Sequence, residues 1–359
     1  MATITYKCPS CASPLTFDGN AKEMACSNCG NNFEVEGLKE AMQVEMETEQ
    51  TPEYKAWDMH DEAFDQNDVK QTKTFSCSSC GAQLLTDETT VATECAFCGS
   101  PSIIPDQFTP GTKPQSVLPF TVKKERAEKL FHDYFKNKKL LPNIFKKNNR
   151  INEIRKLYVP YWLFTCQAFA DISYNASKIR TFTRGNYRIT QTLHYLIRRA
   201  GTVDFKELPI DSSTKADNEI TESLEPYDMG EGLAFTPAIL SGAQASRADV
   251  SIEESKKRAD DRITSSMQSA FRDTILGYST VVPVSTKINI PEGTATPTLF
   301  PIWIITTKKE DKTYTFAING QTEKLTCDVP ISAPKAIGWF LGVSLTALFV
   351  ISLIMYFVL

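Results

Sequence analysis

The last 24 residues of the chain, 336–359, are uncharged and almost continuously apolar. At 1.5 Å rise per residue a helix of this length spans about 36 Å, enough to cross a hydrocarbon core of about 30 Å. A buried core helix is the alternative, but such helices are shorter and keep a polar stripe. The sequence therefore predicts a transmembrane helix over 336–359.

The flanks of this apolar run predict a topology. The N-terminus has no basic stretch followed by an apolar one, so we expect no signal peptide. Lysines lie upstream of the run, and Lys335 stands at its edge. The expected arrangement places residues 1–335 in the cytoplasm, with a single pass through the cytoplasmic membrane. Because nothing follows Leu359, the chain would be tail-anchored.

The segment 105–335 combines strand and helix periodicities. Apolar runs and alternating patterns predict strands at 157–164, 187–197, 299–305 and 314–318. The last of these leads into Asn319-Gly320, a tight-turn signal. Apolar residues at helical spacing predict helices over 123–136 and around 259–271. We therefore expect an α+β cytoplasmic domain between the preceding cysteine-rich region and the membrane helix.

Eight of the ten cysteines form four Cys-x-x-Cys pairs in two clusters. The first cluster consists of Cys8, Cys11, Cys26 and Cys29. The second consists of Cys77, Cys80, Cys95 and Cys98. Fourteen residues separate the two pairs of each cluster, and every cysteine of the second lies 69 positions after its counterpart. This spacing indicates a duplicated unit of about thirty residues.

Two such turns across a short hairpin bring four thiolates to one tetrahedral ion. Glycine follows the second cysteine in three of the four turns, at Gly30, Gly81 and Gly99, where a positive φ is easily adopted. Four thiolates leave no open coordination position, so we expect two structural Zn²⁺ ions in zinc ribbons at 1–37 and 73–104. Matched sets in a cytoplasmic chain disfavour disulfides and a redox pair, whereas an iron–sulfur cluster stays an alternative.

An acidic segment, 38–72, separates the two expected ribbons. It holds ten acidic side chains and three lysines, with few aliphatic residues. This composition predicts a solvated, partly disordered linker that lets the ribbons move relative to each other. Trp57 and Phe64 stand out within it, either as a docking point or, in the favoured interpretation, as aromatics exposed by chance.

A basic stretch follows the second ribbon. Residues 123–156 carry twelve Lys or Arg against four acidic groups. A solvated face is the simple interpretation, and contact with anionic lipid or nucleic acid is the functional one. Lipid is favoured of the two because the apolar run places this domain beside a membrane. The expected membrane-surface residues are Lys123, Lys124, Arg126, Lys136, Lys138, Lys139, Lys146 and Lys147.

Composition and missing motifs exclude several classes of protein. A hydrophobic content of 42%, a charged content of 23% and a net charge of −4 rule out a largely disordered chain, a collagen-like fibre and a polytopic membrane protein. The chain has no phosphate-binding loop, no nucleophile elbow and no H-E-x-x-H motif. We therefore expect no enzyme and assign no catalytic residue, although an unrecognised activity in the α+β domain is a third hypothesis.

Several motifs together resemble one bacterial family. They are Tyr6-Lys7-Cys8-Pro9-x-Cys11, Cys95-Ala96-Phe97-Cys98-Gly99, Leu118-Pro119-Phe120, Val159-Pro160-Tyr161-Trp162, Phe316-Ala317-Ile318-Asn319-Gly320-Gln321-Thr322 and Pro330-Ile331-Ser332. Over essentially its whole length the chain resembles the membrane-anchored, TFIIB-type double zinc-ribbon proteins of Gram-positive bacteria. Glu323 departs from the pattern, since relatives tend to have Gly there, which puts only the local hairpin geometry in doubt.

The resemblance implies a function. Family members are often found beside a flotillin-like (SPFH) protein and a phage-shock-protein-A homologue, which implies recruitment of such partners to the membrane during envelope stress. A non-enzymatic membrane adaptor is therefore the preferred hypothesis. The alternative is a nucleic-acid-binding zinc-ribbon protein tethered to the membrane, although both ribbons are poor in Lys and Arg.

Overall fold

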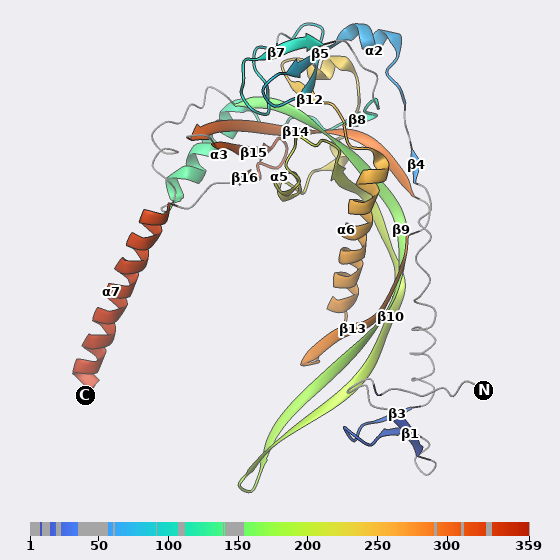
Figure 1. The fold of residues 1–359 in the computed structure, drawn as a ribbon, viewed down its shortest axis with the longest axis vertical. Coiled ribbons are helices and arrows are strands. Elements are labelled where there is room, and N and C mark those ends of the chain that lie inside the picture. Colours follow the sequence, from blue (N-terminus) through green and yellow to red (C-terminus); the bar gives the residue numbers. More distant parts are fainter. Residues whose placement is uncertain are drawn as a thin grey trace. The chain divides into compact units, whose positions relative to one another are not determined.

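The computed structural model describes most of the chain (Figure 1). The described residues are 8, 15–18, 23–34, 57–59, 62–90, 92–106, 112–138, 140, 154–290, 293–309, 312–327 and 332–358. The chain forms two compact units, each assembled from segments that are distant in sequence. Unit 1 comprises Met1–Met59, Phe164–Leu208 and Lys256–Ala295. Unit 2 comprises His60–Leu163, Pro209–Ser255 and Thr296–Leu359.

Unit 2 is built on a mixed β-sheet. Its strands lie in the order β11-β8-β14-β9-β12-β6-β5-β7, and a β15–β16 hairpin pairs with β14. The strands are β5 (Thr72–Cys77), β6 (Gln83–Asp87), β7 (Ile103–Asp106), β8 (Ser116–Val117), β9 (Arg155–Arg184), β11 (Leu233–Ala234), β12 (Gln244–Ser246), β14 (Thr294–Lys309), β15 (Lys312–Asn319) and β16 (Leu325–Cys327). Both long strands, β9 and β14, continue into unit 1.

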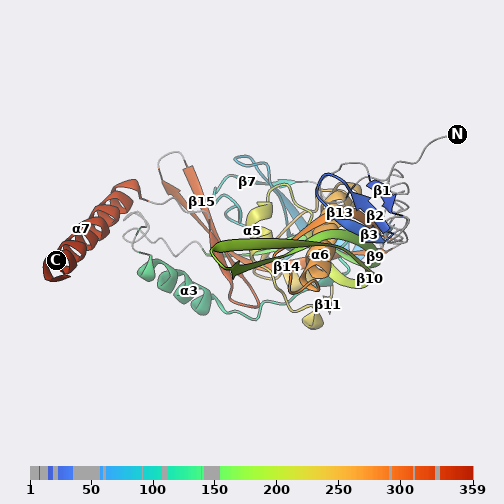
Figure 2. The same ribbon diagram turned by 90° about the horizontal axis from the view of Figure 1, so that it is seen from below.

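The helices of unit 2 are mostly short. They are α2 (Gln66–Gln71), α3 (Lys124–Asn137), α5 (Asn218–Ser223), the 3₁₀ turns η2 (Met229–Glu231) and η3 (Pro237–Leu240), and α7 (Ala333–Val358). The apolar side chains of α3 pack on the β14–β15 part of the sheet, where Phe131 and Phe135 contact Phe316. The ribbons of α3, β14 and β15 are labelled in Figure 2. The indole of Trp303 donates to the Val122 carbonyl at 2.9 Å, so the aromatic core is also tied by a buried hydrogen bond.

The centre of unit 2 is formed by β9 and β14, which both carry an apolar-Pro-x-Trp sequence, at 159–162 and 300–303. Tyr161 on β9 stacks on Phe300 on β14, with ring centroids 4.1 Å apart, and Tyr227 packs on the same ring. The Asn319-Gly320 turn closes beside this core, where the Asn319 amide donates to the carbonyls of Leu224 and Pro226. The strands predicted at 157–164, 299–305 and 314–318 are therefore confirmed, as is the turn.

Unit 1 combines a small sheet with a long hairpin. The small sheet consists of β1 (Leu15–Asp18), β2 (Glu23–Cys26) and β3 (Asn32–Glu34), all antiparallel. The long hairpin is the outer part of β9 paired with β10 (Tyr187–Asp211), and β13 (Thr280–Asn289) pairs with the other edge of β9. Most of α6 (Ile252–Asp273) and the short β4 (Asp58–Met59) complete the unit. The predictions of a strand over 187–197 and a helix around 259–271 are confirmed.

The C-terminal end of the acidic segment 38–72 is folded, which corrects the prediction of a solvated linker there. Residues 66–71 form α2, whose first turn is closed by a reciprocal capping box between Asp65 and Asp68. Trp57 is buried and lies edge-on against Phe164, with ring centroids 5.0 Å apart, which corrects the interpretation that it is exposed. Phe64 is half-buried against Phe235. Residues 38–56 lie outside the described residues, so their predicted disorder is not tested.

Candidate metal centres

The second cysteine cluster comes together as the spacing predicted. The Sγ atoms of Cys77, Cys80, Cys95 and Cys98 all lie within 4.8 Å of one another. Cys77 and Cys98 are 3.7 Å apart, and so are Cys80 and Cys95. A tetrahedral ion with Zn–S bonds of about 2.3 Å requires sulfurs about 3.8 Å apart. The cluster therefore fits one tetrahedral ion, whereas a disulfide requires sulfurs about 2.05 Å apart.

Two matching turns hold these thiols. The N–H of Gly81 donates to the Cys77 carbonyl at 2.8 Å, and the N–H of Gly99 donates to the Cys95 carbonyl at 2.9 Å. Gly81 and Gly99 have φ angles of 71° and 69°, a region that residues other than glycine rarely adopt. The positive φ expected at these two glycines is therefore confirmed.

The protein environment shifts the pKa values of three thiols of the cluster in different directions. Burial raises the pKa of Cys77, but the backbone N–H groups of Cys80 and Ser79 outweigh it and lower the pKa to about 7. Burial is also the main influence on Cys80 and Cys95, and it raises the pKa of Cys80 to about 11 and that of Cys95 further still. Without an ion, burial holds Cys80 and Cys95 in the neutral thiol form. A dication reverses this because it deprotonates coordinating thiols outright.

The first cluster repeats the design on the small sheet of unit 1. The Sγ atoms of Cys8, Cys26 and Cys29 gather within 4.8 Å, and Cys8 lies 3.5 Å from Cys29. Gly30 has φ of 72°, and its N–H donates to the Cys26 carbonyl at 2.9 Å, as in the turns of the second cluster. The predicted fourth ligand, Cys11, lies outside the described residues. Both clusters are consistent with zinc ribbons, one with four described thiols and one with three.

The second cluster is part of the core of unit 2. Its strands β5, β6 and β7 belong to the main sheet, because β6 pairs with β12. Cys77 and Cys95 are almost fully buried in the same hydrophobic cluster as Tyr161 and Phe300. By contrast, the buried residues around the first cluster contact one another within that ribbon: Cys8, Leu15, Met24 and Cys26, with Phe33 beside them. A metal bound by the second cluster would therefore support the core of unit 2, whereas one bound by the first cluster would support only that small sheet.

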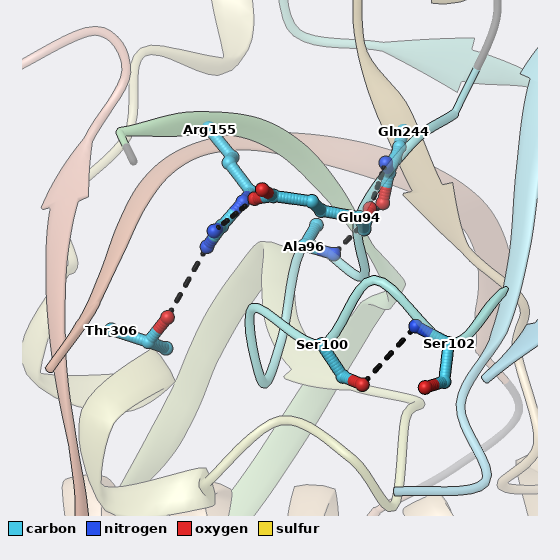
Figure 3. A network of polar contacts seen from close by, with 7 residues as sticks. All are labelled: Glu94, Ala96, Ser100, Ser102, Arg155, Gln244 and Thr306. Atoms are coloured by element: carbon cyan, nitrogen blue, oxygen red, sulfur yellow. Dashed lines mark hydrogen bonds and ion pairs between the residues drawn. The ribbon is translucent and has the colours of Figure 1, made fainter. Parts of the chain in front are cut away.

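Polar side chains fasten the Cys95–Cys98 turn to the sheet (Figure 3). The side chain of Gln244 accepts from the Ala96 N–H at 2.9 Å and donates to the Glu94 carbonyl at 2.7 Å. Arg155 donates to the Glu94 carboxylate at 2.6 Å and to the Thr306 hydroxyl at 3.2 Å. These contacts join residues as far as 151 positions apart, and no motif in the sequence marks them.

Substitution at Gly99 tests this fastening. A Cβ at Gly99 would lie 3.0 Å from the Thr306 hydroxyl and 3.1 Å from the Arg155 guanidinium, whereas a Cβ at Gly81, in the same unit, meets only the Lys215 Nζ at an ordinary 3.6 Å. Both positions carry the positive-φ penalty of about 1–2 kcal/mol. We therefore expect Gly99→Ala to lower the free energy of unfolding of unit 2 by more than this penalty alone. Chemical denaturation measures this free energy, with Gly81→Ala as the matched control. Equal effects at the two sites would contradict the fastening role.

The structure places five of the predicted membrane-surface residues on or beside α3. Lys123, Lys124, Arg126, Lys136 and Lys138 are all exposed. The other three, Lys139, Lys146 and Lys147, lie outside the described residues. Arg126 is engaged by the Glu323 carboxylate at 2.5 Å, which raises the pKa of Arg126 and lowers that of Glu323. Contact of these residues with a membrane surface stays a prediction.

Glu323 itself has a local structural role. It adopts a φ of 63°, the left-handed conformation that favours glycine. Glu323 therefore adopts the backbone conformation expected of glycine in this hairpin, and its carboxylate forms an ion pair with Arg126.

The apolar C-terminal run forms one helix, as predicted. Within α7, the segment Ala333–Tyr356 has 24 residues and a mean hydropathy of 2.2, and none of its most apolar stretch is buried against the rest of the protein. It is long and apolar enough to span a membrane. The helix starts a few residues before the predicted position, because Ala333, Pro334 and Lys335 form its first turn.

Comparison with known proteins gives one relative over nearly the whole chain. The chain is 32% identical to the uncharacterized protein YdjG of Bacillus subtilis (strain 168) over 342 residues, which are 95% of this chain and 94% of the relative. The chain belongs to the YdjG family. No family model matches it, and no solved structure matches it.

Proposed function

We propose that this member of the YdjG family is a non-enzymatic, membrane-anchored zinc-ribbon adaptor. In this proposal α7 crosses the cytoplasmic membrane once and leaves the preceding residues in the cytoplasm. Two structural Zn²⁺ ions, each held by four cysteines, complete the ribbons. The adaptor recruits protein partners of the flotillin-like and phage-shock types to the membrane face in envelope stress.

The observation that carries this proposal is the pairing of a closed metal site with an apolar helix in one chain. Four thiolates occupy every position of a tetrahedral ion, so the second site offers no coordination position to a substrate. The wholly exposed apolar helix requires an apolar environment of its own. A chain with these two features is suited to hold binding surfaces at a membrane rather than to catalyse a reaction there.

The first ribbon is the better candidate for a partner-binding module. Its buried residues contact one another, so it presents its surface without serving the core of unit 2. The second ribbon has much of its interior joined to the main sheet through Gln244, Arg155 and the apolar cluster. Loss of its metal is therefore expected to affect folding as well as binding.

Affinity capture from mildly solubilised membranes, followed by mass spectrometry, tests the proposal. We expect full-length protein to recover flotillin-like or phage-shock-type proteins, and the Cys8→Ser/Cys26→Ser variant to lose some of them while it remains in the membrane. The matched control is Thr16→Ser on β1, which keeps the ribbon. Recovery of no such protein by the wild type would overturn the adaptor proposal.

The alternative is a tethered nucleic-acid-binding protein, supported by the exposed lysines of α3. A binding measurement with DNA and RNA oligonucleotides over a range of salt concentrations discriminates the two. Phosphate contacts would make affinity fall steeply with salt. The adaptor proposal expects no such binding at low salt.

A further inference from the structure

The outer half of the β9–β10 hairpin, residues 178–199, is strongly cationic. It contains six basic residues and no Asp or Glu: Lys178, Arg180, Arg184, Arg188, Arg198 and Arg199. Arg198 is neutralised by a bidentate pair with Asp171, at 2.8 and 2.6 Å. Arg180, Arg184 and Arg188 lie nearer the tip and are exposed. The tip therefore carries uncompensated positive charge within the hairpin itself.

Apolar side chains are exposed on the same part of the hairpin. Tyr187 is 77% exposed, and four further side chains are between 36% and 49% exposed: Ile179, Phe182, Tyr195 and Leu196. Aliphatic groups such as Ile179 and Leu196 gain nothing from a nucleic-acid backbone. They gain free energy when they enter the interfacial region of a bilayer, where aromatic side chains are also favoured.

The strand geometry sorts these residues onto two faces. Gly185, with φ of 60°, and Asn186 form a two-residue turn, which places Arg184 opposite Tyr187. The 3.4 Å contact between the Thr181 and Thr190 hydroxyls agrees with this register. Since side chains alternate along a strand, Arg180, Phe182 and Arg184 share one face with Tyr187 and Tyr195. The threonines lie on the other face together with Arg188, Ile179 and Leu196, so two of the three exposed arginines lie on the same side as the aromatic side chains.

No described strand covers the edges of this part of the hairpin, and side-chain contacts support its base. β13 pairs with β9 only over Phe169–Ser177, and among the described residues no strand flanks the hairpin beyond that point (Figure 1). Lys178 Nζ lies 4.7 Å from the ring centroid of Tyr278 and 5.6 Å from that of Tyr195, and the two rings pack edge-on. These contacts brace the base of the exposed segment.

We propose that the tip of the β9–β10 hairpin binds the surface of an anionic lipid bilayer. Arg180 and Arg184 attract the anionic headgroups from the face that they share with Phe182 and Tyr187, and these two aromatic side chains insert at the interface. Arg188, next to the turn on the other face, adds to the positive charge of the tip. Each cation near an anionic surface strengthens binding severalfold. The inference rests on the proposed function only in taking a membrane as the surroundings of the chain. It adds to α7 a second, lipid-selective contact made by unit 1.

A flotation experiment with the full-length protein tests this. The protein is held through α7 in nanodiscs of phosphatidylcholine, mixed with separate liposomes of phosphatidylcholine with or without phosphatidylglycerol, and centrifuged through a density gradient. We expect the nanodiscs to float with the phosphatidylglycerol liposomes only. Arg180→Gln/Arg184→Gln/Arg188→Gln should weaken this binding about 100-fold. Phe182→Ser/Tyr187→Ser should weaken it about tenfold without changing its salt dependence.

A charge-matched control distinguishes the effect of the hairpin arginines from the effect of a lower net charge of the whole protein. Lys70→Gln/Lys206→Gln/Lys257→Gln removes three exposed cations from other parts of the surface and should bind as the wild type does. Equal weakening in this control would overturn the proposal, as would wild-type binding by the arginine variant. Hairpin-dependent binding of an oligonucleotide in place of liposomes would also overturn it. Partner capture is read separately, so a chain that floats but captures no partner contradicts only the proposed function.

Discussion

Replacement of Cys77 and Cys80 by serine is expected to remove one zinc ion per chain and to unfold the sheet of unit 2 as well as the ribbon. Cys77 is buried in the hydrophobic cluster that contains Tyr161 and Phe300. Structural zinc contributes about 10–16 kcal/mol to the folding of small ribbons. A typical domain is stable by only about 5–15 kcal/mol, so loss of the ion is comparable with the whole stability of the unit.

Zinc content and near-ultraviolet circular dichroism measure the two parts of this prediction. The aromatic signal of unit 2 should disappear together with the metal, because Tyr161 and Phe300 stack directly within the affected core. The Cys8→Ser/Cys26→Ser variant is the matched control. It should lose the ion of the first ribbon and leave the unfolding transition of unit 2 unchanged. A Cys77→Ser/Cys80→Ser protein with a wild-type transition would show that the sheet does not depend on the second ion.

The double substitution Leu345→Arg/Leu348→Arg in the middle of α7 is expected to release the protein from the membrane. Each arginine at the centre of a membrane helix costs about 2.5–3.5 kcal/mol in insertion, so the pair lowers the insertion equilibrium by more than a thousandfold. Both leucines are exposed on the helix, and the substitutions leave the packing of the preceding domain untouched. Fractionation of cells, followed by alkaline extraction of the membranes, measures the result.

The control for this pair is Leu345→Ala and Leu348→Ala. Alanine keeps the helix uncharged and should leave the protein in the membrane fraction. If the arginine variant resisted extraction as the wild type does, α7 would not be the anchor. If the alanine variant were released as well, the leucines would act through contacts with another protein rather than through lipid.

Local sequence signals were sufficient for the metal sites and for several elements. The Cys-x-x-Cys spacing and its glycines predicted the second cluster, because the turn geometry is set within five residues. Ala127 and Phe131 predicted the buried face of α3, since residues four apart on a helix lie on one side. The uncharged run at the C-terminus predicted α7 for the same local reason.

The remaining features depend on contacts between distant segments. Gln244 joins the second ribbon to the sheet across 148 residues, so a ribbon predicted as a separate module contributes to a larger core. Trp57 lies in an acidic stretch that predicts exposure, yet Phe164 buries it. The cationic hairpin carried no motif. Its significance depends on a register that brings Arg180 and Arg184 onto one face with Phe182 and Tyr187.

The metal content of full-length protein extracted from membranes tests the central claim most directly. The account predicts two zinc ions per chain, each surrounded by four sulfurs at about 2.3 Å in X-ray absorption. Such sites are closed, as a structural role in an adaptor requires. Iron in place of zinc, or an oxygen or nitrogen ligand from solvent at either ion, would contradict the account and direct attention to redox or catalytic chemistry.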